Sequence, residues 1–200
     1  MLVWLDGAFG VGKTTVAKAL ARRWPAALSF DPEQLGFLLR RIGPPDLRTR
    51  DFQEMPLWRQ LVRQTAAGLI EHHGRPLIVP MALPDPRACD EIVGELRRSG
   101  LDVRHFLLLA SDSTLRRRLL WRWSLPASRR WAHAQISRFP RPACAPDLAT
   151  CLQTDRRRVQ DLVAEILATL PNPLPTTAAI GPHPMPPVAG TGQPPPACDG

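Results

Sequence analysis

The sequence is short of lysine, of closely paired cysteines and of long apolar runs. Only two lysines, Lys13 and Lys18, stand among the 26 Lys+Arg residues. The four cysteines form no C-x-x-C pair, which argues against a zinc site and predicts unreactive packing residues in a reducing compartment. No apolar run approaches the roughly 18 residues of a membrane-spanning helix, and the N-terminus shows no signal peptide. We therefore expect a cytoplasmic protein.

Acidic residues are also missing from one long segment, between Ser113 and Pro146. The same segment contains eight arginines, as many positive charges as the formal net charge of +8 for the whole chain. Such a concentration of charge predicts an anionic partner. The arginines are Arg116, Arg117, Arg118, Arg122, Arg129, Arg130, Arg138 and Arg141.

One motif organises the N-terminal part of the chain. An apolar run at 2–5 is typical of a strand, and good helix formers follow from about 13 to 24. Between them lies a complete G-x-x-x-x-G-K-[ST] phosphate-binding loop, or P-loop, whose glycines let backbone N–H groups approach a triphosphate at a helix N-terminus. Its residues are Gly7, Ala8, Phe9, Gly10, Val11, Gly12, Lys13 and Thr14.

This motif assigns roles to individual side chains. Lys13 is expected to reach the β- and γ-phosphates, Thr14 to ligate Mg²⁺, and Thr15 to add a contact to the α-phosphate. Many P-loop enzymes hold Mg²⁺ with an aspartate at the end of the third strand, but Pro80 and Met81 occupy that place here. Metal binding would therefore rest on Thr14, phosphate oxygens and water. The expected ligands are ATP and Mg²⁺.

Strand-like and helix-like segments alternate along most of the chain. We expect strands near 2–5, 27–30, 77–81, 103–110 and 150–153, with helices between and after them. The alternation predicts an α/β fold, a P-loop NTPase of nucleotide-kinase type with a parallel, roughly five-stranded sheet flanked by helices. We assign this domain to residues 1–170, and the proline-rich residues 171–200 to a disordered tail.

Asp31 is a candidate catalytic base. It follows the second strand, where a carboxylate could face an acceptor substrate and take a proton from its hydroxyl. An aspartate before a proline is also a good helix start, so Asp31 could equally cap the next helix. The two roles are compatible.

Residues 51–59, in an insertion after the second strand, are expected to lead into a long helix that Gly74 ends. Such an insertion commonly forms a wall of a substrate pocket. Phe52, Trp58 and Arg59 are candidates for that wall, although a tryptophan on an apolar stripe is more often a core residue. 

The arginine segment predicts a lid of two short helices. Arg118 and Arg122 lie four residues apart on one face of the first, so both could neutralise charge on a transferred phosphoryl group. In the competing interpretation, the tryptophans and arginines of this segment form a surface that binds nucleic acid or a membrane interface.

Several segments together resemble the ATP-binding tunicamycin resistance proteins, P-loop proteins related to small-molecule kinases such as chloramphenicol phosphotransferase. The resemblance covers roughly residues 1–170. Its most distinctive parts are Ile78-Val79-Pro80-Met81 and Asp51-Phe52-Gln53, supported by Asp31-Pro32-Glu33 and Gln153-Thr154-Asp155.

The resemblance implies ATP binding and resistance to tunicamycin or a similar nucleoside antibiotic. It makes Lys13, Asp31, Arg118 and Arg122 the candidate catalytic residues, and it places Asp155 near the adenine. We expect phosphoryl transfer to a hydroxyl of the drug, with ATP-gated sequestration without catalysis as the alternative. Nucleic-acid binding ranks below both. Relatives can end in a membrane-associated segment, but the tail here has no amphipathic pattern, so peripheral membrane contact lacks support.

Overall fold

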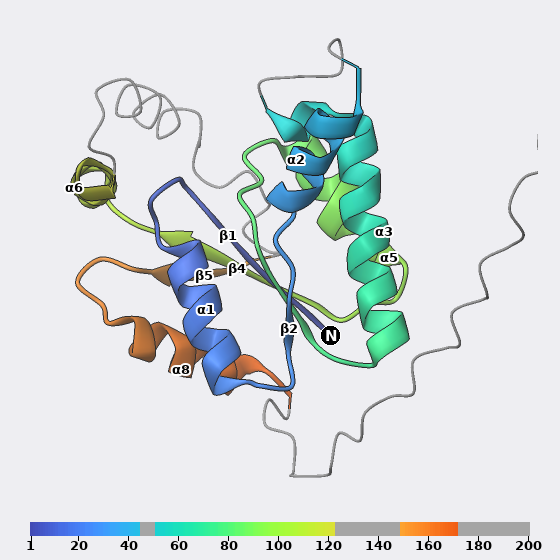
Figure 1. Cartoon of the computed structure of the whole chain (residues 1–200). Coiled ribbons are helices and arrows are strands. Elements are labelled where there is room, and N and C mark those ends of the chain that lie inside the picture. The colour runs from blue at the N-terminus through green and yellow to red at the C-terminus, as the bar shows by residue number, and fades with distance from the viewer. Residues whose placement is uncertain (45–50, 123–148, 172–200) are drawn as a thin grey trace, which may run out of the picture.

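The computed structural model describes residues 1–44, 51–122 and 149–171. Five strands form one sheet in the order β2-β3-β1-β4-β5, and every neighbouring pair is parallel. Helices cover both faces (Figure 1). The predicted α/β fold with a five-stranded parallel sheet is therefore confirmed.

The elements follow one another as the alternation predicts. The strands are β1 Leu2–Gly7, β2 Leu28–Ser29, β3 Leu77–Pro80, β4 Val103–Leu109 and β5 Thr150–Gln153. The helices are α1 Lys13–Arg23, α2 Glu33–Ile42, η2 Phe52–Glu54, α3 Pro56–His73, α4 Pro86–Cys89, η3 Asp90–Gly94, α5 Glu95–Arg98, α6 Asp112–Arg122 and α8 Val159–Thr169.

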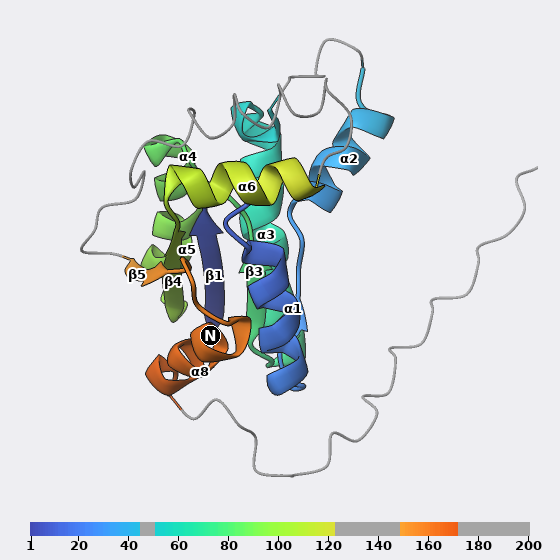
Figure 2. The ribbon, with the colours of Figure 1, turned by 90° about the vertical axis from the view of Figure 1, so that its left-hand side faces the viewer.

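The central strand β1 separates two apolar cores. Leu2 and Trp4 pack with residues of α3, η3 and α5 on one face of the sheet. Val3 and Leu5 pack with residues of α1 and α8 on the other. Successive side chains of a strand point to opposite faces, so an unbroken apolar run fits a strand covered by helices on both sides. Figures 1 and 2 show these two helical layers.

Local sequence signals account for the helix ends. Gly74 closes α3 in the left-handed conformation with φ of 59°, as expected for a C-cap glycine. Ser111 precedes α6, and its hydroxyl accepts a hydrogen bond from the Thr114 N–H. The helical segment after Asp85, between β3 and β4, consists of α4, η3 and α5 in succession, and η3 is a π-helix.

Parts of the expected structure are wrong or lie outside the described residues. Cys89 is disulfide-bonded, contrary to the expectation of four reduced packing cysteines, whereas Cys151 is free and exposed. The second lid helix and nearly all of the tail fall outside the described ranges, so both stay predictions. Within those ranges, no helix has the length and apolar character needed to cross a membrane.

Candidate nucleotide-binding site and adjoining pocket

The P-loop lies between the end of β1 and the start of α1. The φ angles of Gly7, Gly10 and Gly12 are 134°, 81° and 111°. Residues that have a Cβ rarely adopt such positive φ angles. A Cβ at Gly7 would also lie 2.4 Å from the Leu108 carbonyl oxygen, inside van der Waals contact. The glycines therefore allow both the backbone path and its close packing on β4.

Lys13 folds back over this loop. Its Nζ donates to the carbonyl oxygens of Gly7 at 2.7 Å and Ala8 at 3.1 Å. The same ammonium group lies 5.8 Å from the centre of the Phe9 ring. These contacts hold a positive charge over the loop. The predicted contact of Lys13 with the β- and γ-phosphates stays a prediction.

The N-terminus of α1 is open to a ligand. Its N-cap is Gly12, and no side chain caps it within the described residues. A Cβ at Gly12 would meet no atom within 4 Å. Thr14 and Thr15 are exposed in the first turn, where a helix dipole favours anions. The loop and the first turn of α1 thus carry hydroxyl, ammonium and backbone N–H groups, a donor set that fits a nucleotide phosphate.

A metal ion would find few protein ligands here. The described residues include no group of three or more His, Cys, Asp or Glu side chains that could hold one. The assignment of Thr14 as a magnesium ligand stays a prediction.

Asp6 is a buried residue of β1 that contacts the P-loop. Its side chain is 1% exposed, and its Oδ1 accepts hydrogen bonds from the N–H of Gly7 at 2.6 Å and of Leu83 at 3.0 Å. Its Oδ2 lies 3.2 Å from Nε2 of the buried His105 on β4. One carboxylate thus joins the P-loop, β4 and the loop after β3.

Arg118 connects α6 to two loops at this end of the sheet. Its Nη1 donates to the Val11 carbonyl oxygen at 2.8 Å and to Thr154 Oγ1 at 3.0 Å, and its Nη2 donates to the Thr154 carbonyl oxygen at 3.0 Å. Figure 2 shows α6 crossing above the end of β1. Arg122 ends α6, and its side chain is outside the described part.

Asp155 holds the other end of α6. Its two carboxylate oxygens accept hydrogen bonds from the backbone N–H and the hydroxyl of Ser111, both at 2.9 Å. Hydrogen bonds from the side chains of Thr114 and Ser111 lower the pKa of Asp155. The carboxylate is therefore engaged in positioning α6, and its expected place near adenine stays a prediction.

Asp31 is exposed just after β2. Its Oδ1 accepts a hydrogen bond from the Glu33 N–H at 3.0 Å, so the side chain supports the start of α2. This contact agrees with the capping alternative, although α2 begins after Pro32. The base role of Asp31 stays a prediction.

A pocket of about 510 Å³ adjoins the loop after β3. Arg59 lines it, as expected for the insertion, but Phe52 and Trp58 are core residues that stack on each other with ring centres 6.4 Å apart. The pocket is lined by Asp51, Gln53, Glu54, Arg59, Pro84, Asp85, Arg87 and Glu91.

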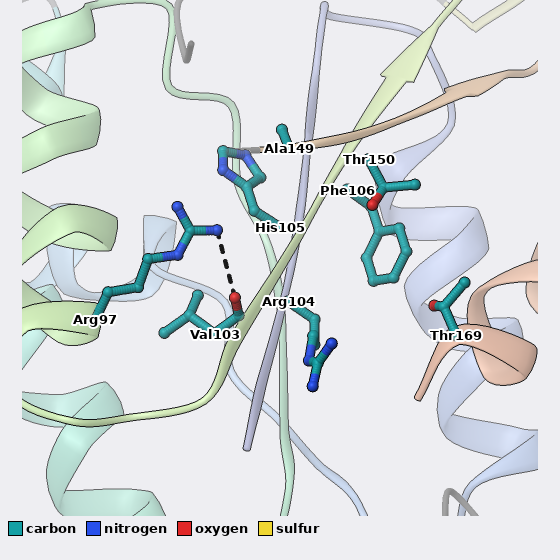
Figure 3. A pocket seen from close by; sticks show the side chains of 8 residues that line it. All are labelled: Arg97, Val103, Arg104, His105, Phe106, Ala149, Thr150 and Thr169. Atoms are coloured by element: carbon teal, nitrogen blue, oxygen red, sulfur yellow. Dashed lines mark hydrogen bonds between the residues drawn. The ribbon is translucent and has the colours of Figure 1, made fainter. Parts of the chain in front are cut away.

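The second pocket, of about 220 Å³, lies around the first half of β4. Figure 3 shows Arg97 and His105 on one side of the strand and Phe106 on the other. The Arg97 Nη2 donates to the Val103 carbonyl oxygen at 3.3 Å. Because the P-loop follows the opposite end of the parallel strand β1, this pocket is not adjacent to the expected phosphates.

A protein-family model matches the part of the chain that contains the P-loop. The family model AAA_33, described as an AAA domain, matches residues 2–142. This chain belongs to that AAA domain family. A comparison with curated proteins gave no match.

Several solved structures share the fold of this AAA domain. The tunicamycin resistance protein of Deinococcus radiodurans is 25% identical with a TM-score of 0.66, over 84% of this chain and 93% of that chain. The APS kinase of Mycobacterium tuberculosis, in complex with AMPPNP and APS, is 20% identical with a TM-score of 0.58, over 84% and 95%. A sugar kinase of Janibacter sp. is 20% identical with a TM-score of 0.56, over 84% and 92%. The resemblance to tunicamycin resistance proteins is confirmed, and the two kinases support the fold.

Asp6, His105, Gln53 and Asp85 were not among the predicted site residues, yet the first two pair beside the P-loop and the last two line the 510 Å³ pocket. Asp6 and His105 are polar residues inside apolar strands, and a buried polar side chain in such a strand needs a partner. That signal could have found the pair. Gln53 and Asp85 come together only through tertiary contacts, 32 positions apart in the sequence.

Proposed function

We propose that this protein binds Mg-ATP and transfers the γ-phosphoryl group to a hydroxyl of a small molecule, with tunicamycin or a similar nucleoside antibiotic as the leading acceptor. The observation that carries the proposal is the P-loop, where Lys13 lies over the loop and the α1 N-terminus has no side-chain cap within the described residues. The similarity to the Deinococcus radiodurans protein supports the choice of drug.

The chemistry follows from charge and position. Lys13, the α1 N-terminus and a magnesium ion held through Thr14 would neutralise the triphosphate and align its γ-phosphoryl group. The hydroxyl oxygen of the acceptor would attack the γ-phosphorus, and ADP would leave. Asp31 would accept the proton of that hydroxyl. Arg118 and Arg122 would stabilise charge on the transferred group.

The alternative is a protein that binds the drug only when ATP is bound and does not phosphorylate it. The positions of Arg118 and Asp31 in the structure support this alternative. Arg118 is bonded to Val11 and Thr154, and Asp31 is exposed and does not line the 510 Å³ pocket. Catalysis would require both to change partners, whereas sequestration would not.

The deciding experiment incubates the purified protein with Mg-ATP and tunicamycin and follows the drug by mass spectrometry. A product heavier by one phosphoryl group supports the kinase. Unmodified drug whose calorimetric binding depends on ATP supports sequestration, and absence of both contradicts the resistance function.

Lys13→Met and Lys18→Met form a matched pair for this assay, because both lysines lie on α1 and only Lys13 contacts the P-loop carbonyls. We expect Lys13→Met to weaken ATP binding by about tenfold to a hundredfold, the loss of a charge-assisted contact. The exposed Lys18 should be replaceable without loss.

A further inference from the structure

His105 and Asp6 form a buried pair on neighbouring strands, next to the P-loop. Their side chains are 0% and 1% exposed, and His105 Nε2 lies 3.2 Å from Asp6 Oδ2. His105 pairs in register with Trp4 of β1, and Asp6 comes two residues after Trp4, on the same face of the sheet. Among the described residues, His105 is the one basic side chain in contact with the Asp6 carboxylate.

The hydrogen bond in this pair runs from the imidazole to the carboxylate. A carboxylate only accepts hydrogen bonds, and Asp6 Oδ1 accepts them from the N–H groups of Gly7 and Leu83. We therefore assign the imidazole hydrogen to Nε2. The Nδ1 atom, which is buried without a hydrogen-bond partner among the described residues, then carries no hydrogen that would need an acceptor. Because a buried carboxylate is costly unless hydrogen bonds compensate its charge, His105 supplies the contact that keeps Oδ2 in place.

Gly7 connects the same carboxylate to Lys13. Its N–H donates to Asp6 Oδ1 over 2.6 Å, and its carbonyl oxygen accepts a hydrogen bond from Lys13 Nζ over 2.7 Å. The Gly7 backbone also packs directly on β4, since a Cβ at this position would lie 2.4 Å from the Leu108 carbonyl oxygen. A rotation of the Gly7 backbone would therefore move the oxygen that holds the ammonium group.

We infer that His105 is a positioning residue for the binding of nucleoside di- and triphosphates. Its imidazole holds the Asp6 carboxylate, which in turn holds the Gly7 N–H. The Gly7 carbonyl oxygen then holds the Lys13 ammonium group over the P-loop. Without the imidazole, Asp6 Oδ2 loses this partner, and the carboxylate no longer fixes the Gly7 backbone. The inference rests on the proposed function, since it takes Lys13 to bind the phosphates of ATP.

The test measures how tightly the full chain binds a non-hydrolysable ATP analogue in the presence of Mg²⁺, by calorimetry. His105→Leu removes the donor, whereas His105→Gln places an amide N–H about as far along the side chain as Nε2. We expect His105→Leu to weaken binding by about threefold to tenfold, and His105→Gln to retain most of the affinity. His105→Asn is a second, polar variant in case leucine prevents folding, because its amide ends where Nδ1 lies and should weaken binding as leucine does.

A double-mutant cycle with Lys13→Met separates positioning from a general loss of stability. Because His105 acts through Lys13, His105→Leu should change the affinity by less than about twofold once Lys13 is replaced. Ligand-observed NMR measures the weak binding of the variants that lack Lys13.

Val103→Ala is the matched control. Val103 is buried on the same face of β4 as His105, and it pairs with Leu2 at the end of β1 farther from the P-loop. Val103→Ala should lower the urea midpoint and leave the affinity for the analogue unchanged.

Normal affinity in both His105→Leu and His105→Asn, with weakened binding in Lys13→Met, overturns the inference and leaves the proposed function standing. An equal loss of affinity in Val103→Ala overturns it as well, as does an undiminished effect of His105→Leu in the Lys13→Met background. Unchanged affinity in Lys13→Met would instead contradict the proposed function, and the inference with it, so the two failures are distinguishable.

Discussion

The Arg118 guanidinium donates a hydrogen bond to the Val11 carbonyl oxygen over 2.8 Å, which connects α6 directly to the P-loop. The same guanidinium group bonds both oxygens of Thr154, which follows β5. One side chain therefore fixes the relative positions of α6 and two loops. In this structure Arg118 therefore positions α6, the P-loop and the loop after β5.

Replacing Arg118 by lysine should separate these elements. An ammonium group cannot reproduce the planar fork that serves Val11 and Thr154 together. Loss of two hydrogen bonds should lower the free energy of unfolding by about 1–3 kcal/mol and weaken ATP binding. Urea denaturation and calorimetry measure the two effects. Arg117→Lys, at an exposed position of α6, is the control. Full stability with normal ATP binding would contradict the positioning role.

Asp31→Asn tests the proposed base. Asparagine keeps an oxygen for the Glu33 N–H, so α2 should begin as before. Because the amide cannot accept a proton, turnover should fall by at least about a hundredfold while ATP still binds. Phosphorylated product is counted by mass spectrometry, with Asp102→Asn as a charge-matched control. Unchanged turnover in Asp31→Asn would remove this residue from the mechanism.

The order and type of most elements could be predicted from the sequence because they rest on local signals. The apolar run at 2–5 alternates between two buried faces, and Gly74 adopts the left-handed conformation that ends α3. The P-loop could also be predicted from local sequence, since its glycines and Lys13 lie within one motif of eight residues. These signals need no knowledge of the tertiary structure.

The partners of residues that join distant segments could not be predicted from local signals. Asp6 bonds Leu83 and faces His105, positions 77 and 99 residues further along the chain. Gln53 and Asp85 meet in one pocket from separate elements. Trp58 also fits either a pocket wall or the core by spacing alone, and only its burial decides for the core.

Asp6→Ala should destabilise the protein strongly. The substitution leaves the buried N–H groups of Gly7 and Leu83 without their acceptor. Each such loss costs about 1–3 kcal/mol, so the free energy of unfolding should fall by about 2–6 kcal/mol. Asp6→Asn keeps one acceptor oxygen and should lose less. Asp102→Ala, at an exposed position, is the control in urea denaturation. Equal stability of the alanine variants would contradict this role for Asp6.

Asp155 should make the stability of the protein sensitive to acid. Hydrogen bonds from Thr114 and Ser111 lower its pKa in the folded state, while an unfolded aspartate titrates near a pKa of about 3.9. A lowered folded pKa stabilises the fold above the unfolded pKa, and this stabilisation is lost as the pH falls through the folded pKa. Asp155→Asn should therefore lower the urea midpoint at pH 7, and the difference from the unmodified protein should shrink below about pH 4. Asp112→Asn, which removes an exposed charge from α6, is the control. A difference that stays constant from pH 7 to pH 3 would show that the charge on Asp155 does not hold α6 in place.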